Sequence, residues 1–245
     1  MILKNKKAFI TGGTGAIGEK LCEIFSREGA DIAFNYEKNE KKAKTVLAAI
    51  KKNKRQGLAF KCSVLDSPGI EKMTAEIISK YGRIDILVNN AGITQVLPLP
   101  LIEEEDWDRM MAVNVKGMFL VTKEVVRRMI GRKSGVILNI GSIAGQRLLE
   151  VPVHYATAKS AVLGFTISLA KELARYNIRV NAVAPGMLDA GVGTNVPEKQ
   201  YKEYLKYCAA GRPGKPEEVA HFAAFLCSDQ AKYINAQNMI IDGGL

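Results

Sequence analysis

A chain of 245 residues can bury one substantial hydrophobic core, and its 47% hydrophobic and 24% charged residues are ordinary for a globular protein. The formal net charge of +10 favours encounters with anionic partners, yet the basic residues are spread among carboxylates, which argues against a nucleic-acid surface. The four cysteines are scattered, which argues against disulfides. With only two histidines as well, we expect no metal. The first residues lack a long hydrophobic stretch, so we expect a cytoplasmic protein without a membrane span.

Short apolar runs alternate with longer segments of helical periodicity along the chain. This alternation is typical of parallel strands joined by crossover helices. We therefore expect one α/β domain over residues 1–245, a Rossmann-type doubly wound fold whose seven-stranded parallel sheet is flanked by helices. The predicted strands lie at residues 8–10, 32–34, 58–60, 86–88, 136–138, 180–183 and 239–241.

Three of the expected helices have recognisable ends. The first follows the first strand and can end at Gly29, because glycine often terminates a helix. Pro68 favours the first turn of the second, with Ser67 or Asp66 as its cap. The third runs from about Tyr155 to Arg175.

A glycine-rich segment, residues 11–18, lies between the first strand and the first helix. Glycine permits a tight turn and a close approach of the backbone to a pyrophosphate, and the N–H groups at the helix start favour that anion. A lone glycine-rich loop is as often a plain turn, but the strand and helix on either side favour dinucleotide binding. The predicted contacts here are Gly12, Thr14, Gly15, Ala16, Ile17 and Gly18.

Tyr155 and Lys159 are four residues apart on a predicted helix, so their side chains share one face. A cation roughly 4 Å from a phenolate is worth about 4 kcal/mol at an effective dielectric near 20. We therefore expect Lys159 to lower the pKa of Tyr155 and make it a proton donor. Ser142, just past a predicted strand, can donate a hydrogen bond to a developing oxyanion. Taken singly, each residue also has a purely structural explanation: Ser142 as a turn residue, Tyr155 as a packed aromatic and Lys159 as a solvated charge.

These motifs resemble those of the short-chain dehydrogenase/reductase family over nearly the whole chain. Residues 11–18 are similar to its Thr-Gly-x-x-x-Gly-x-Gly motif, with Ala16 in place of the usual middle glycine, and residues 89–92 to its Asn-Asn-Ala-Gly. We expect Gly15, beside Ala16, to restore the flexibility that the usual middle glycine would provide. The Tyr-x-x-x-Lys pair follows in the family's order. When the motifs at residues 211–220 and 241–244 are included, the sequence is most similar to the bacterial 3-oxoacyl-(acyl-carrier-protein) reductase group.

The resemblance implies a role for each site residue. Tyr155 would protonate a carbonyl oxygen while Ser142 orients it, and Lys159 would also bind the nicotinamide ribose. Asn114 would support a water-linked proton relay to that lysine. Asn90 has an equally good explanation as a support between strand ends. The implied cofactor contacts beyond the glycine loop are Tyr36, Ser63, Val64, Asn90, Ala91, Gly92, Tyr155, Lys159, Pro185 and Gly186.

The least regular stretch, residues 187–204, is rich in glycine and carries Pro197. Long loops in compact domains are usually functional or disordered, so we interpret it as a substrate lid, with a plain surface connection as the alternative. Ala190 stands where the family commonly has a threonine, and Thr194 lies four residues further on. The sequence therefore departs from the family pattern at a position that would shape the lid.

The choice between NADP(H) and NAD(H) depends on the residues after the second predicted strand. The aspartate that would bind both ribose hydroxyls is absent there. Lys38 and the positive net charge favour NADP(H), whereas Glu37 opposes a phosphate. We favour NADP(H), with NAD(H) as the alternative.

The expected reaction is reduction of a carbonyl to a secondary alcohol, and the resemblance points to a 3-oxoacyl thioester, as in fatty acid biosynthesis. An acidic acyl carrier protein would then be a partner. The basic residues that could form its docking surface, or that merely keep the protein soluble, are Arg128, Arg132, Lys133 and Arg175. An NAD-dependent secondary alcohol or sugar dehydrogenase is the alternative enzyme. A nucleotide-binding or nucleic-acid-binding module without catalysis is the alternative of another class, and the intact Ser142, Tyr155 and Lys159 argue against it.

The resemblance also implies a homotetramer, assembled through the helix that carries the Tyr-x-x-x-Lys pair and the helix before it. Val162, Phe165 and Leu169 are apolar residues of that helix. They suit burial in a core or in an interface, and the sequence leaves both open.

Overall fold

The computed structural model describes residues 1–147, 149–191 and 196–245, and over these residues it contains one sheet of seven parallel strands. The strands lie in the order β3-β2-β1-β4-β5-β6-β7, so the chain reverses its direction of travel across the sheet between β1 and β4. The predicted fold and all seven predicted strands are confirmed. Their bounds are β1 Lys7–Ile10, β2 Asp31–Tyr36, β3 Gly57–Lys61, β4 Ile86–Asn89, β5 Gly135–Ile140, β6 Ile178–Pro185 and β7 Asn238–Ile241.

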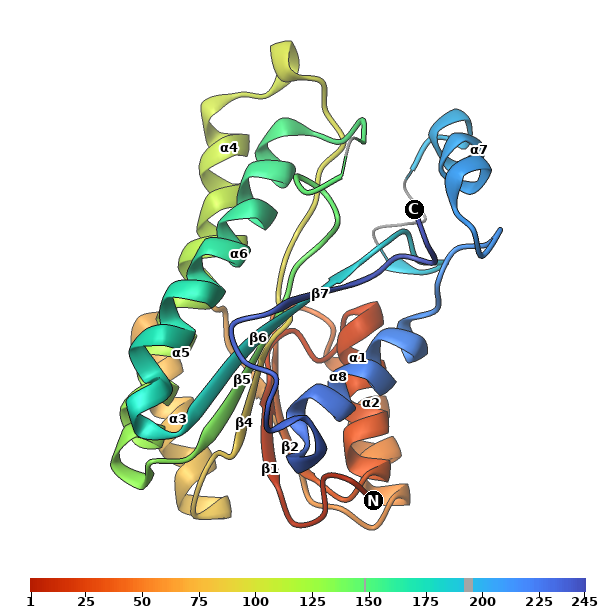
Figure 1. The fold of residues 1–245 in the computed structure, drawn as a ribbon. Helices are drawn as coiled ribbons and strands as arrows, with labels where there is room; N and C mark the ends of the chain where they lie inside the picture. The colour runs from red at the N-terminus through yellow and green to blue at the C-terminus, as the bar shows by residue number, and fades with distance from the viewer. Residues whose placement is uncertain (148, 192–195) are drawn as a thin grey trace.

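Helices cover both faces of the sheet (Figure 1). One face carries α1 Ala16–Arg27, α2 Glu40–Lys52 and α8 Pro216–Cys227, and the other carries α3 Ser67–Tyr81, α5 Gly117–Arg132 and α6 Val153–Leu173. Helix α4, Glu104–Met111, runs through a π-helical turn at Ala112–Lys116 into α5, and α7, Glu198–Tyr207, stands away from the sheet (Figure 1). Short 3-10 turns lie at Leu99–Leu101, Ala174–Tyr176 and Asp229–Ala231.

The sheet separates two hydrophobic layers because successive side chains of a strand point to opposite faces. In β1, Ala8 and Ile10 pack with α1, α2 and α8, whereas Phe9 packs with α3, α5 and α6. Each central strand therefore buries apolar side chains on both faces of the sheet. This burial is the main stabilisation of a parallel sheet.

Local signals place the helix ends. The Asp66 side chain accepts a hydrogen bond from Gly69 N at 3.1 Å, so Asp66 rather than Ser67 caps α3. Helix α6 ends at Leu173, earlier than predicted, because the chain tightens into a 3-10 turn before Asn177 adopts the left-handed conformation with φ of 54°.

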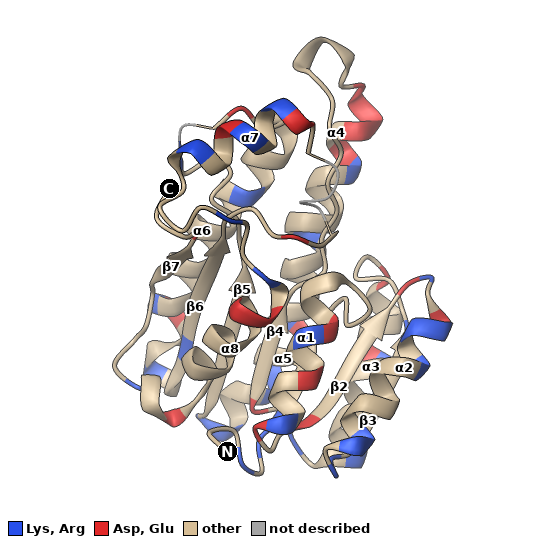
Figure 2. Ribbon diagram, turned by 90° about the vertical axis from the view of Figure 1, so that its right-hand side faces the viewer, with Lys and Arg blue, Asp and Glu red and all other residues tan. Residues whose placement is uncertain are grey.

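The charges do not gather on one face of the molecule (Figure 2). Lys and Arg residues are spread over the helices and the ends of the sheet, while acidic residues are concentrated at the start of α4 (Figure 2). Within the described residues, no helix is both long enough and apolar enough to cross a bilayer.

Candidate active site

A pocket of about 790 Å³ lies at the carboxyl ends of the strands, above the point where the strand order reverses. This is where ligands bind in open parallel sheets. Gly18, Asn114 and Lys159 lie behind its wall rather than in it. The other predicted site residues all line it: Gly12, Thr14, Gly15, Ala16, Ile17, Tyr36, Ser63, Val64, Asn90, Ala91, Gly92, Ser142, Tyr155, Pro185 and Gly186.

The glycine loop fits a pyrophosphate through its backbone. Gly12 has φ of 67°, and a β-carbon there would lie 3.0 Å from the backbone of Ala91. A β-carbon on Gly18 would overlap the carbonyl oxygen of Gly12, so Gly18 allows α1 to pack against the loop and need not touch a ligand. The N-cap residue Gly15 has no side chain to cap the first N–H groups of α1, which leaves them for an anion.

Gly15 does not provide the backbone flexibility expected beside Ala16. Its φ of −72° and ψ of 168° are ordinary extended values that any residue adopts, and the left-handed turn falls at Gly12 instead. Ala16 is the first residue of α1, where an alanine is favourable because it forms helix well. The loop therefore accommodates Ala16 without help from its neighbour.

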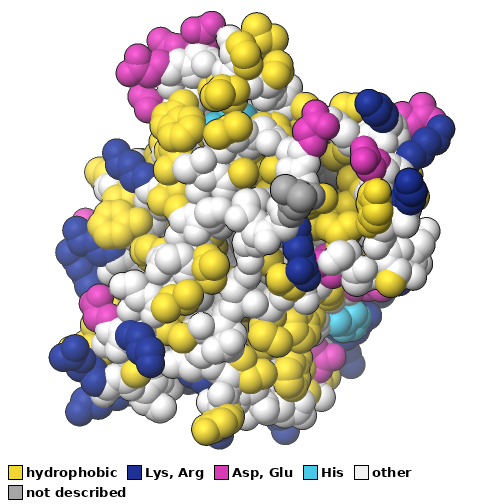
Figure 3. Space-filling model, turned by 45° about the horizontal axis from the view of Figure 1, so that its top comes forward, with side chains coloured by type: hydrophobic (Ala, Val, Ile, Leu, Met, Phe, Trp, Pro, Cys, Tyr) yellow, Lys and Arg dark blue, Asp and Glu magenta, His cyan; other side chains and the backbone are white. Residues whose placement is uncertain are grey.

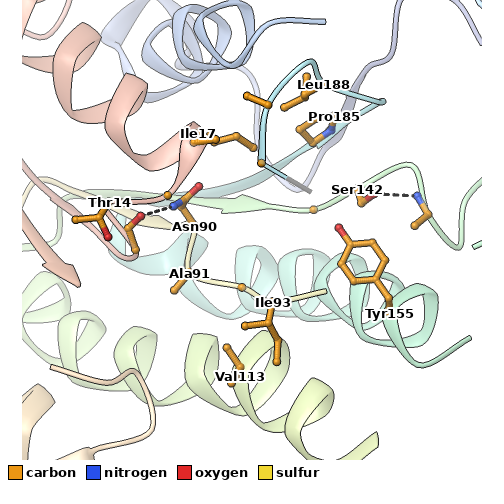
Figure 4. Close-up of a pocket in the computed structure, with 18 of the residues that line it drawn as sticks. Thr14, Ile17, Asn90, Ala91, Ile93, Val113, Ser142, Tyr155, Pro185 and Leu188 are labelled. Carbon is orange, nitrogen blue, oxygen red and sulfur yellow. Dashed lines mark hydrogen bonds between the residues drawn. The ribbon is translucent and has the colours of Figure 1, made fainter. Parts of the chain in front are cut away.

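Asn90 holds the glycine loop to the end of β4. Its Nδ2 donates to the carbonyl oxygens of Thr11 at 2.9 Å and Gly12 at 3.1 Å, while its backbone N–H donates to the Thr11 hydroxyl. The sequence left open whether Asn90 supports the strand ends or contacts the ligand. The structure shows the supporting hydrogen bonds, and Asn90 also lines the pocket (Figure 4).

Sequence reasoning missed Asn35, which supports this region. Its buried side chain accepts from Gly12 N at 3.1 Å and donates to the Cys62 carbonyl at 2.8 Å, which joins the glycine loop to the end of β3. A polar residue inside an otherwise apolar strand was the available signal, because buried amides need partners. Tyr36 and Ser63 follow these two positions and line the same part of the pocket.

Tyr155 and Ser142 face one another across the pocket, from α6 and from the segment after β5 (Figure 4). The Ser142 hydroxyl also accepts a hydrogen bond from Ala144 N at 3.1 Å. Burial raises the pKa of the Tyr155 phenol, and the nearby Ser142 hydroxyl partly offsets this. The phenol therefore keeps its proton at neutral pH.

The expected lowering of the Tyr155 pKa by Lys159 is wrong for this structure. The Lys159 Nζ lies 5.8 Å from the centroid of the Tyr155 ring and donates to the carbonyl oxygen of Ile140 at 3.0 Å. The ammonium is directed at the strand end rather than at the phenol oxygen, so desolvation dominates. Burial also lowers the pKa of Lys159 itself, to about 8.

Asn114 lies beside Lys159 because the π-helical turn at Ala112–Lys116 brings it into the interior. Its Oδ1 accepts from Ile93 N at 3.3 Å, and its Nδ2 donates to the carbonyl of Ile93 at 3.1 Å and that of Met110 at 3.0 Å. A β-carbon on Gly92 would lie 2.6 Å from Asn114 Oδ1 and 3.6 Å from Lys159 Nζ. Both polar groups therefore converge on Gly92.

Beyond Tyr155 the pocket wall is mainly apolar. Six of the residues predicted as part of a lid belong to this wall, from Met187 to Tyr204, but the segment is not irregular throughout because α7 begins at Glu198. Thr194 lies outside the described residues. Sequence reasoning had no period or motif to find the other apolar and basic lining residues, which include Ile93, Arg109, Val113, Ile143, Leu149 and Val151.

The described side chains include no group of three or more His, Cys, Asp or Glu that could hold a metal ion. The parallel sheet has a phosphate-binding turn at its switch point, beside a Tyr–Lys pair on one helix. This combination defines a nicotinamide-dependent oxidoreductase. The chain belongs to the short-chain dehydrogenase/reductase family. A family profile described as enoyl-(acyl carrier protein) reductase matches residues 13–245.

Similar proteins agree with this assignment over their full lengths. The 3-oxoacyl-(acyl-carrier-protein) reductase FabG of Thermotoga maritima is 41% identical, with 100% of this chain and 99% of that protein aligned. The counterpart of Chlamydia pneumoniae is 35% identical over 99% of this chain and 98% of its own. The structure of the Serratia marcescens BCRC 10948 short-chain dehydrogenase/reductase matches with a TM-score of 0.93, 35% identity and coverage of 100% and 99%. NAD+-bound xylitol dehydrogenase matches with a TM-score of 0.93, 28% identity and 100% coverage of both chains.

Proposed function

We propose that the protein reduces the ketone of a 3-oxoacyl thioester to a secondary alcohol, using NADPH in preference to NADH. The observation that carries the proposal is the pair of facing hydroxyls of Tyr155 and Ser142 at the start of the apolar part of the pocket (Figure 4). Such a pair can hold one carbonyl oxygen while an acyl chain extends along the apolar wall. Two relatives named as 3-oxoacyl-(acyl-carrier-protein) reductases support the substrate class.

Each site residue then has one task in the proposed reduction. The nicotinamide cofactor, when bound, supplies the hydride that adds to the carbonyl carbon. Tyr155 donates its phenolic proton to the carbonyl oxygen, and Ser142 donates a hydrogen bond that holds that oxygen in place. Lys159 would supply the replacement proton for the phenol, and Asn114, which converges with Lys159 on Gly92, would support a water that links the relay to the lysine. The raised pKa of Tyr155 suits this direction because the phenol remains protonated until it reacts.

The backbone around the pocket would hold the cofactor. Gly12, Thr14 and the first turn of α1 would bind the pyrophosphate, while Tyr36, Ser63 and Val64 would surround the adenosine. Lys38 lines the pocket and would attract the 2′-phosphate of NADPH, whereas Glu37 beside it would repel that group. We favour NADPH because the net charge of +10 adds to the effect of Lys38.

An acyl carrier protein would bring the substrate, but the basic surface is weaker than the sequence suggests. Arg132 donates to Asp85 at 2.8 Å and to the Ile84 carbonyl at 2.9 Å, so it is engaged in holding α5 to β4. Arg128 pairs with Glu124 at 3.4 Å. Lys133 and Arg175 therefore remain the better candidates for docking an acidic carrier.

We also propose that the chain forms a homotetramer and that the segment 187–204, of which residues 192–195 lie outside the described part of the chain, acts as a lid. An apolar stripe spaced by four residues supports the assembly. It runs along α4, the π-helical turn and α5 through Trp107, Met111, Val115 and Phe119, with Trp107 and Phe119 exposed by 36% and 45%. Hydrophobic side chains are visible beside the acidic tip of the molecule (Figure 3). Val162 is a core residue, so it does not contribute to the interface.

The deciding experiment measures oxidation of NADPH and of NADH with 3-oxoacyl thioesters, carried on coenzyme A and on acyl carrier protein, and with simple ketones and sugars. The proposal expects the thioesters with NADPH to give the highest kcat/KM. Turnover of a ketone without turnover of any thioester would reject the substrate class and retain the chemistry. Higher kcat/KM for NAD+ with a secondary alcohol or sugar would favour the alternative dehydrogenase.

A further inference from the structure

The segment after β5 carries Ser142 and is tied to the far edge of the sheet by two amide side chains. Gln146 Nε2 donates to the backbone carbonyl of Ser142 at 2.7 Å. Gln146 Oε1 accepts a hydrogen bond from Asn238 Nδ2, although the two residues are 92 positions apart in the chain. One glutamine thus connects the backbone of Ser142 to strand β7.

The register of the sheet explains why Asn238 can reach this segment. Asn238 stands beside Ala182 of β6, and Ala182 stands beside Asn139 of β5. Residues in register on parallel strands point to the same face. The Asn139 amide donates to Thr166 of α6, so Asn238 also lies on the face that α6 covers, where the segment after β5 leads into that helix.

The same turn is pressed against α6 from its other side. Gly145 has φ of 77°, and a β-carbon there would lie 2.7 Å from the carbonyl oxygen of Ala156. The Ser160 hydroxyl donates to the Gly145 carbonyl at 3.3 Å. A second contact reaches the residue just after β7, because Arg147 pairs with the largely buried side chain of Asp242 at 3.6 Å. The turn is therefore held between the helix that carries Tyr155 and the strand that carries Asn238.

We propose that Gln146 and Asn238 are positioning residues that aim the Ser142 hydroxyl at the substrate carbonyl. Gln146 fixes the Ser142 carbonyl, and Asn238 fixes the amide of Gln146, so that the serine backbone cannot rotate. A misplacement of about 1 Å in a catalytic group can cost 10²-fold in rate, so two hydrogen bonds outside the pocket are enough to matter. This inference rests on the proposed function, in which Ser142 holds the carbonyl oxygen.

Two variants interrupt the connection at different points. Gln146→Glu keeps an acceptor for Asn238 but has no donor for the Ser142 carbonyl. Asn238→Ala removes the donor to Gln146. Each is expected to lower kcat by about tenfold, with the KM for NADPH changed by less than about twofold, because the cofactor loop lies elsewhere. Gln237→Ala is the matched control, since among the described residues its side-chain amide donates only to the carbonyl of Asn235, and kcat should stay at the wild-type value.

A double-mutant cycle with Ser142→Ala separates positioning from general support of the fold. If Gln146 acts through the Ser142 hydroxyl, Gln146→Glu costs nothing further once that hydroxyl is absent. An equal loss of kcat in both backgrounds would overturn the inference, as would a wild-type kcat for both Gln146→Glu and Asn238→Ala. If Ser142→Ala alone leaves kcat unchanged, the proposed role of Ser142 fails first and the inference fails with it. Circular dichroism and melting temperature verify that every variant is folded.

Discussion

The ammonium nitrogen of Lys159 lies 5.8 Å from the ring centroid of Tyr155, while its hydrogen bond goes to the Ile140 carbonyl at the end of β5. Helix α6 thus presents a phenol to the pocket and keeps a cation behind it, next to Asn114. Burial raises the pKa of Tyr155 and lowers the pKa of Lys159, so it favours the neutral form of each group. A neutral phenol is a proton donor, which is what reduction of a carbonyl requires.

Replacing Tyr155 with phenylalanine removes the proposed donor and little else. We expect Tyr155→Phe to lower kcat for carbonyl reduction by roughly 10²- to 10⁴-fold, the usual contribution of a general acid. NADPH affinity, followed by fluorescence titration, should be retained. Tyr233→Phe is the control, because Tyr233 is fully exposed. Undiminished reduction by Tyr155→Phe would contradict the mechanism.

Lys159 should make stability depend on pH in a defined window. Its pKa is about 8 in the folded protein against 10.5 for the ordinary group. Below pH 8 the charged form is buried at a cost of roughly 3 kcal/mol, from about 1.4 kcal/mol per pKa unit. Between pH 8 and 10.5 the folded protein has lost the proton that the unfolded chain still binds, so this cost declines as pH rises.

Lys159→Met removes that cost, so its gain in the free energy of unfolding should be largest below pH 8 and shrink toward pH 10.5. Urea unfolding of wild type and variant at a series of pH values measures the difference. A gain that stays constant across this range would show that the ammonium is not desolvated as the geometry indicates.

Gly18 should tolerate no side chain, since a β-carbon would overlap the carbonyl of Gly12. We expect Gly18→Ala to cost about 1–3 kcal/mol in stability, as overpacking does, and to weaken NADPH binding because the phosphate loop must move. Gly131→Ala is the matched control in α5, where a β-carbon meets nothing within 4 Å. It should be neutral or stabilising by up to about 1 kcal/mol. Equal behaviour of the two variants would refute the packing argument.

Glu37 should work against NADPH. Glu37→Gln is expected to lower the KM for NADPH by about two- to fivefold, the size of one exposed charge interaction, and to leave the KM for NADH unchanged. Glu40→Gln is the control, because Glu40 pairs with Lys44 and does not line the pocket. Identical responses of the two cofactors to Glu37→Gln would place the 2′-phosphate elsewhere.

Short-range patterns account for the elements that were predicted well. The apolar run of β1, the glycines at 12 and 18, and the spacing of Tyr155 and Lys159 are each visible within a few residues of sequence. Hydrophobic periodicity identifies strands and helices because it reports which face is buried. The same patterns do not reveal which glycine takes the left-handed turn, so the flexibility was assigned to Gly15 when the structure needs it at Gly12.

Sequence by itself determined that this chain folds as a parallel α/β sheet with a phosphate-binding turn and a Tyr–Lys pair on one helix, since those features depend on neighbours along the chain. Only the tertiary structure decided where the Lys159 ammonium points, that Asn35 joins the glycine loop to β3, and that Gln146 meets Asn238. These contacts join residues far apart in sequence, and strand register and burial, rather than local propensity, bring them within hydrogen-bonding distance.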